Sequence, residues 1–178
     1  MPDVWDEMDE VAGRVEREAR REQEAAEAEA RQLRLASRTL TDVAWEAMQQ
    51  GRRVRLRWVG GELAGVPLAA VGDLVVIGTD EGAAGINVAV LGSVETTGEK
   101  ADRGLVGDRS VESFVAWCRM IEARPVKVTV IGGRNVDGIL LAVAPDHLLI
   151  RTRHGNDVAV ARTQVAAVSV VGDPFLAL

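Results

Sequence analysis

The chain has 178 residues and a net charge of −6, and 47% of its residues are hydrophobic. That hydrophobic content is enough to build a core and argues against a disordered chain. The negative net charge excludes a global attraction to nucleic acid or anionic membranes, although a local basic face is compatible with it. Cys118 is the single cysteine, so an intramolecular disulfide and a thiolate metal site within one chain are excluded.

The sequence holds no run of roughly 18 apolar residues, the length that a membrane-spanning helix needs. The acidic start of the chain also lacks the apolar stretch of a signal peptide. These two features predict a cytoplasmic protein.

Residues 1–38 form a highly charged region with seven Arg, no Lys and eleven Asp or Glu. No helix breaker occurs between Gly13 and Ser37, and Ala, Glu, Arg and Gln favour helix, so we predict a helix. Its seven-residue apolar pattern is interrupted by Glu and makes a poor coiled-coil seam. Two interpretations stay open: a solvated helix, or a helix that pairs with a partner through Trp5, Met8 and Val15.

From residue 39 the sequence repeats itself at an offset of 72, which grows by one after the first Gly-Gly pair. The aligned segments are Val43–Met48 with Val115–Met120, Gly60-Gly61 with Gly132-Gly133, Gly65 with Gly138, Asp73 with Asp146 and, after a small gap, Val88–Val90 with Val158–Val160. We therefore predict two copies of one unit, residues 39–97 and 108–178, joined by a linker at 98–107.

Each copy predicts a short helix followed by several short strands. The first predicted strands, Val54–Trp58 and Val126–Val130, alternate apolar and polar residues and end at a Gly-Gly pair that suits a tight hairpin. Strands at this spacing are typical of a small antiparallel barrel. The predicted apolar helix faces are Val43, Trp45 and Met48 in one copy and Phe114, Trp117, Met120 and Ile121 in the other, with Asp108 or Ser110 as the N-cap of the second helix.

The order of these elements resembles the Sm-like fold. In that family a Gly in the second strand, an Asp at the next turn and a late Arg recur, and Gly138, Asp146 and Arg162 match these places in copy two. Gly65 and Asp73 match the first two in copy one, with Gly92 near the place of the Arg. The RNA-contacting Asn or aromatic residue after the Asp is missing, so the resemblance does not extend to RNA binding.

The whole chain is also similar to uncharacterised actinobacterial proteins with a charged N-terminal helix and two Sm-like barrel repeats. The fold class that these resemblances imply is mainly β with α. It consists of an N-terminal charged helix followed by two tandem Sm-like small antiparallel β-barrels, each preceded by a short helix.

The residues that most often carry chemistry are sparse in this sequence. The glycine clusters lack the spacing of a phosphate loop or a dinucleotide fingerprint, so we interpret them as turns. His147 and His154 have no neighbours at ligand spacing, and we predict both on surface turns. Cys118 is predicted to be a buried, inert thiol. We predict no catalytic residues, no cofactor and no metal.

Four arginines mark the best candidate binding face. Arg53, Arg55 and Arg57 alternate along one predicted strand and share a face, with Arg52 beside them. They are a possible nucleic-acid or partner face, or they pair with the many acidic residues. The scarcity of aromatic residues, with two Phe and no Tyr, disfavours single-strand stacking.

The last predicted strand, Val165–Val171, is apolar and uncharged and would be a hazard as a bare edge. We predict that the first barrel, the N-terminal helix or a second chain covers it. With a second chain as the hypothesis, Val165, Val168 and Val170 form a possible oligomer edge in a homo-oligomer, most often a dimer. The function expected from all these features is a non-enzymatic interaction or scaffold protein. The alternative is an RNA- or DNA-associated regulator that uses the arginine face.

Overall fold

The computed structural model describes residues 4–100 and 111–171, which fall into two compact units, Met1–Arg38 and Thr39–Leu178. In the first unit, helix α1 (Val4–Ala36) confirms the predicted helix, and its described side chains from residue 16 onward are exposed. The side chains of Trp5, Met8 and Val15, the predicted partner-helix face, lie outside the described part. Among the described helices, none combines the length and apolar character needed to cross a membrane.

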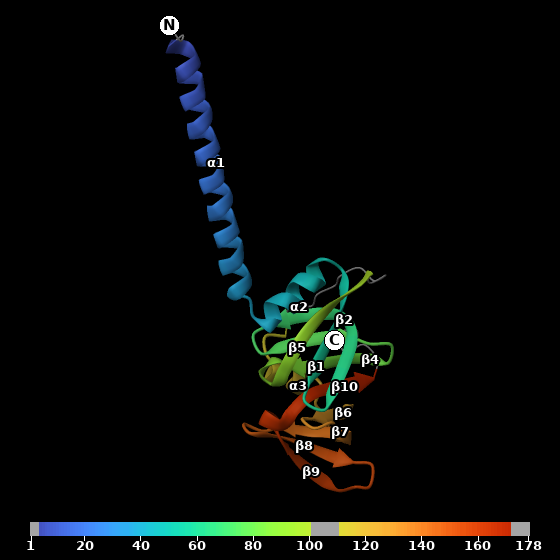
Figure 1. The fold of residues 1–178 in the computed structure, drawn as a ribbon. Helices are drawn as coiled ribbons and strands as arrows, with labels where there is room; N and C mark the ends of the chain where they lie inside the picture. Colours follow the sequence, from blue (N-terminus) through green and yellow to red (C-terminus); the bar gives the residue numbers. More distant parts are fainter. Residues whose placement is uncertain (1–3, 101–110, 172–178) are drawn as a thin grey trace. The chain divides into compact units, whose positions relative to one another are not determined.

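Within its described residues, the second unit holds two short helices, two 3₁₀ turns and ten strands. Figure 1 shows how these elements are arranged. The helices are α2 (Leu40–Gln49) and α3 (Phe114–Met120), and the 3₁₀ turns are η1 (Val88–Val90) and η2 (Arg162–Gln164). The strands are β1 (Arg52–Trp58), β2 (Gly61–Val71), β3 (Leu74–Gly78), β4 (Gly82–Asn87), β5 (Leu91–Lys100), β6 (Pro125–Val130), β7 (Asn135–Val143), β8 (His147–Thr152), β9 (Asp157–Ala161) and β10 (Val165–Val171).

All ten strands form one antiparallel sheet in the order β5-β1-β2-β3-β4-β10-β6-β7-β8-β9. The same five-strand order therefore occurs twice, since β10 stands beside β6 as β5 stands beside β1. We call residues 39–100 repeat one and residues 111–171 repeat two. The mainly β class with some α is confirmed, and β1 and β6 occupy equivalent places as the sequence repeat predicts. The sheet is open, so two closed Sm-like barrels are not confirmed.

A matched irregularity in the second strand of each repeat supports this equivalence. The register shifts between Pro67 and Ala69 in β2 and between Leu140 and Ala142 in β7. The glycine ahead of each shift lies so close to the next strand that a Cβ on it would collide with a carbonyl oxygen. The family-like glycines Gly65 and Gly138 are these two residues, so close strand packing explains their identity.

The repeats are joined through a strand pair that we call the seam, formed by β4 and β10. β10 pairs with β4 on one side and with β6 on the other, so it lies inside the sheet. Val165, Val168 and Val170 are buried there. Repeat one of the same chain, one of the three predicted candidates, therefore covers the strand, and the hypothesis that these residues form an oligomer edge is wrong.

The two Gly-Gly hairpin turns meet each other beside the seam. The Gly132 N–H donates to the carbonyl oxygen of Val59 over 2.8 Å. A Cβ on Gly60 would lie 2.5 Å from the backbone carbon of Gly132, so the turns touch backbone to backbone. Gly60 and Gly132 have φ values of +87° and +89°, which glycine adopts readily. These glycines thus make the hairpins and also bring the repeats together.

Helix α3 packs over the seam and buries Phe114, Trp117 and Cys118. Trp117 is fully buried, and its Nε1–H donates to the carbonyl oxygen of Val168 in β10 over 3.3 Å. A Cβ on Gly85 of β4 would collide with the Trp117 ring, so glycine makes room for the indole. The N-cap of α3 is Ser113, and the predicted caps at residues 108 and 110 are wrong and lie outside the described residues. The N–H of Phe114 also donates to Asp73 Oδ1 of repeat one over 2.9 Å.

Helix α2 packs on repeat one with a different face from the predicted one. Thr39 and Asp42 form a capping box at its start. Its buried residues are Thr41, Ala44, Ala47 and Met48. Met48 is buried as predicted, but Trp45 is 51% exposed, so its predicted place on the apolar face is wrong and the two aligned tryptophans have different environments.

One segment of the sequence alignment is wrong. Val88–Val90 forms η1, and its structural counterpart is η2 rather than Val158–Val160, which lies in β9. The Val88 N–H donates to the carbonyl oxygen of Asp73, and the Arg162 N–H donates to that of Asp146. The counterpart of Arg162 is therefore Val88 and not Gly92. The gap was misplaced because short valine-rich segments resemble each other whether they form a strand or a turn.

Candidate groove between the repeats

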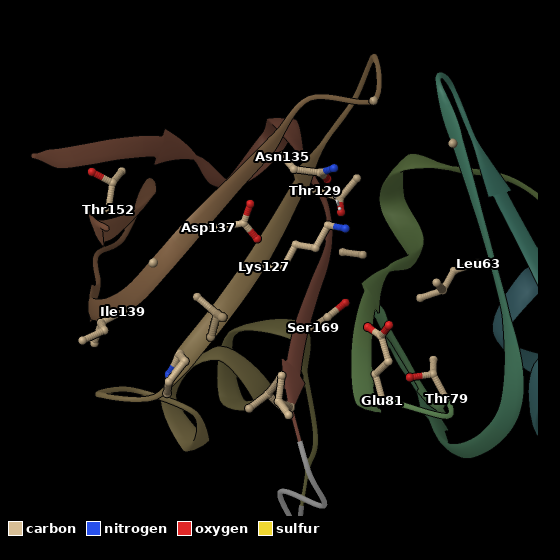
Figure 2. Close-up of a pocket in the computed structure, with 18 of the residues that line it drawn as sticks. Leu63, Thr79, Glu81, Lys127, Thr129, Asn135, Asp137, Ile139, Thr152 and Ser169 are labelled. Carbon is tan, nitrogen blue, oxygen red and sulfur yellow. Dashed lines mark hydrogen bonds between the residues drawn. The ribbon is translucent and has the colours of Figure 1, made fainter. Parts of the chain in front are cut away.

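A groove of about 990 Å³ lies between the two repeats (Figure 2). Its floor is the outward face of β10, β6 and β7 in repeat two, and the opposite wall is the β1–β2 hairpin with the β3–β4 turn of repeat one. The β8–β9 turn closes the far side. Because strands present alternate residues to opposite faces, the floor is built from the side chains that the core does not use.

The floor side chains lie in cross-strand rows. A polar row consists of Ser169, Lys127 and Asp137, which face one another by register across β10, β6 and β7. A second row, at the end where β10 ends, is apolar at Pro125 and Ile139, with Val171 on the same face. Ile139 is 43% exposed and Val171 is 79% exposed. The floor therefore offers an apolar strip beside a polar strip.

Two equivalent turns form the lips of the groove. The turn Thr79–Gly82 joins β3 to β4, and the turn Thr152–Gly155 leads from β8 toward β9. In Figure 2, Glu81 and Thr79 lie on one side of the floor and Thr152 lies on the other. The first lip carries Asp80 and Glu81, whereas the second carries Arg153. The lips thus have opposite charge at matching places of the two repeats.

The lip charges are exposed and available. Asp80, Glu81 and Arg153 form no ion pair with any residue in the described part of the chain, and all three side chains are exposed. The neighbouring Arg151 differs, because its guanidinium binds Asp157 over 2.8 and 3.0 Å. This contact raises the pKa of Arg151 and lowers that of Asp157.

The predicted arginine face lies on β1, and two of its four arginines are paired with glutamates. Arg57 Nε donates to Glu62 Oε2 over 2.9 Å, and this hydrogen bond raises the pKa of Arg57. Arg55 Nη1 lies 3.8 Å from Glu95 Oε2, and Arg57 Nη2 lies 3.5 Å from the same oxygen. Arg53 lines the groove, and Arg52 is exposed at the start of the strand. The acidic neighbours weaken the cationic field of this face.

The two histidines and the cysteine lie in three different environments. His147 Nδ1 is 2.7 Å from Asp146 Oδ1, and this hydrogen bond lowers the pKa of Asp146. His154 is exposed in the β8–β9 turn. Burial raises the pKa of the Cys118 thiol to about 12. Within residues 4–100 and 111–171, no group of three His, Cys, Asp or Glu is placed to hold a metal ion.

The groove was not predicted from the sequence. Its floor belongs to repeat two and its wall to repeat one, so it exists only because β4 and β10 pair. A usable signal was present: aligned turns of the two copies, Asp80-Glu81 and Arg153-His154, differ in charge while the residues around them match. Searches against protein-family models and curated proteins found no match to the chain.

Proposed function

We propose that this chain is a non-enzymatic interaction or scaffold protein built from two Sm-like units, with the groove between the repeats as its binding surface. The observation that carries the proposal is this 990 Å³ groove, whose opposing lips bear charges that form no ion pair with a described residue. Support for the Sm-like part comes from the short helix and five antiparallel strands of each repeat, in the same strand order. Charged lips and an apolar strip on a strand floor suit recognition of a polypeptide segment.

Self-association remains part of the proposal, with a dimer as the first expectation and the exposed helix α1 as the available surface. Strand β10 offers no free edge for self-association, because it is paired on both sides. Light scattering should then give twice the 19.1 kDa chain mass. A chain without residues 1–36 should lose the association, since β10 is not its cause.

The test is affinity capture from native lysate with and without nuclease. Glu81→Lys alters the groove, and Glu112→Lys is a control with the same charge change on an exposed residue outside the groove lining. We expect captured proteins to survive nuclease, to be lost with Glu81→Lys and to be kept with Glu112→Lys. Capture abolished by nuclease would instead favour a nucleic-acid-associated role through the arginines of β1.

A further inference from the structure

The opposite charges of the two lips restrict what the groove can recognise. A ligand of uniform charge would be attracted at one lip and repelled at the other, and like charges brought together reduce affinity. A ligand with a basic end and an acidic end gains at both lips. Asp80 and Glu81 suit the basic end, and Arg153 suits the acidic end.

The sheet fixes the separation of these two ends. From β4, which begins at the acidic lip, to β8, which ends at the basic lip, the order β4-β10-β6-β7-β8 contains four strand intervals. At about 4.8 Å per interval the lips are roughly 19 Å apart along the sheet. An extended chain rises about 3.3 Å per residue, so about six residues span this distance.

The floor between the lips fixes the character of the central residues. Pro125 and Ile139 are paired by register, and with Val171 they give an exposed apolar strip across three strands. In an extended segment every second side chain points the same way. The residues two, four and six positions after the basic residue would therefore face the floor. The sixth is the acidic residue, and the second and fourth should be apolar.

We propose that the groove binds an extended segment of a partner protein that carries a basic and an acidic residue about six positions apart, with apolar residues between them. The basic residue lies at Asp80 and Glu81, the acidic residue lies at Arg153, and the apolar side chains cover Pro125 and Ile139. This inference rests on the proposed function, because it names the chemistry of the partner that the groove takes.

The test uses three end-blocked, dye-labelled peptides and the full-length protein. The first is Lys-Ser-Val-Ser-Val-Ser-Asp, the second has Lys at both ends, and the third has Asp at both ends. Fluorescence anisotropy at low salt should show that the wild-type protein binds the mixed-charge peptide about tenfold more tightly than either other peptide, a difference of about 1.4 kcal/mol. No binding of the mixed-charge peptide at millimolar protein, or equal binding of all three, overturns the inference.

Charge reversal of one lip at a time sharpens the test. Arg153→Glu should transfer the preference to the peptide with two Lys, and Asp80→Lys with Glu81→Lys should transfer it to the peptide with two Asp. Glu112→Lys should leave the preference unchanged. All of these residues are exposed, so unchanged circular dichroism should show that the variants fold. Lysate capture that depends on Glu81 without any peptide discrimination would leave the proposed function standing and refute the mixed-charge recognition.

Discussion

The seam and the two outer edges of the sheet are built from equivalent strands, yet they have opposite character. At the seam β4 meets β10, the fourth strand of repeat one against the fifth of repeat two. The outer edges are the remaining fifth and fourth strands, β5 and β9. Neither seam strand contains a charged residue, whereas β5 contains Glu95, Glu99 and Lys100 and β9 contains Asp157. Equivalent strands therefore stand at the seam and at the outer edges of the sheet, but only the outer-edge strands carry charged residues.

At equivalent positions, the outer strands lack the residues that make contacts at the seam. By strand register, Gly85 of β4, which accommodates the Trp117 ring, corresponds to Ala159 of β9. Asn87 donates through Nδ2 to the carbonyl oxygen of Val165 across the seam over 3.2 Å, and its counterpart is Ala161.

The fifth strands differ in the same way, since Ser169 of β10 corresponds to Glu95 of β5. Charged residues on an edge strand discourage further pairing. This difference explains why the two repeats form one seam and why the sheet does not continue beyond ten strands.

The largest expected effect comes from the two aligned tryptophans. Trp117→Ala removes a fully buried indole at the seam and should cost about 4 kcal/mol in the free energy of unfolding. Trp45→Ala removes a side chain that is 51% exposed and should cost about 1 kcal/mol or less. Urea denaturation measures both values. Equal costs would show that Trp117 does not have the seam role assigned to it.

The next effect concerns the seam glycine. Gly85→Val places atoms where the Trp117 ring lies and should destabilise the fold by about 3 kcal/mol. The matched control is Ala159→Val at the equivalent position of outer strand β9, which is exposed and should change stability by no more than about 0.5 kcal/mol. Thermal unfolding of the two variants compares seam and edge directly, and a stable Gly85→Val protein would contradict the packing.

The contact between the Gly-Gly turns gives a smaller effect. Gly60→Ala combines a positive φ with a collision against Gly132 and should cost about 2 kcal/mol. Gly51 also has positive φ, at +63°, but open space around it, so Gly51→Ala should cost only about 1 kcal/mol. The difference in urea midpoint isolates the contact between repeats. If the two costs agree, the contact contributes nothing beyond backbone strain.

Substitution of the aligned aspartates Asp73 and Asp146 should change the free energy of unfolding by less than the substitutions above. Asp73→Ala removes an acceptor for the first N–H of α3 and should cost about 1 kcal/mol, as other helix caps do. Asp146 instead binds His147, which lowers its pKa. Its contribution is therefore present at neutral pH and is lost as the pH falls through that lowered pKa.

A pH series of unfolding measurements checks this pair. Asp146→Ala should reduce the acid sensitivity of the fold as well as its stability at neutral pH, whereas Asp73→Ala should mainly reduce stability at neutral pH. The reverse pattern would contradict the assignment.

The final prediction concerns assembly rather than stability. Giving the outer strands seam residues, with Glu95→Ser on β5 and with Asp157→Ala, Ala159→Gly and Ala161→Asn on β9, should make copies pair edge to edge. Light scattering of the full chain should then show species larger than those of the wild-type protein at the same concentration. An unchanged mass would mean that these residues do not end the sheet.

The sequence predicted what depends on local pattern and missed what depends on distant pairing. Alternation in Val54–Trp58 and the Gly-Gly turns located equivalent strands, because strand period and turn conformation are local properties. The seam joins residues 81 positions apart, such as Ile86 and Ala167, and no local pattern specifies it. The absence of charge from β10 did predict that this strand is covered, and the same absence from β4 was the available signal for its partner.

The candidate site was predicted less well than the fold. The arginine face was located correctly on β1, but its pairing with Glu62 and Glu95 depends on which strands lie beside it. Asp80 and Arg153, which line the groove, were not predicted as site residues. Their shared location follows only from the junction of the two repeats.

The distance of the seam along the chain has a consequence during synthesis. β4 leaves the ribosome about 80 residues before β10, the strand that will cover it. At about 5–20 residues per second, its uncharged edge waits roughly 4–16 s for its partner. On a crowded polysome this interval gives the β10 of a neighbouring nascent chain time to bind first, which would yield a domain-swapped pair with the same seam made between two molecules.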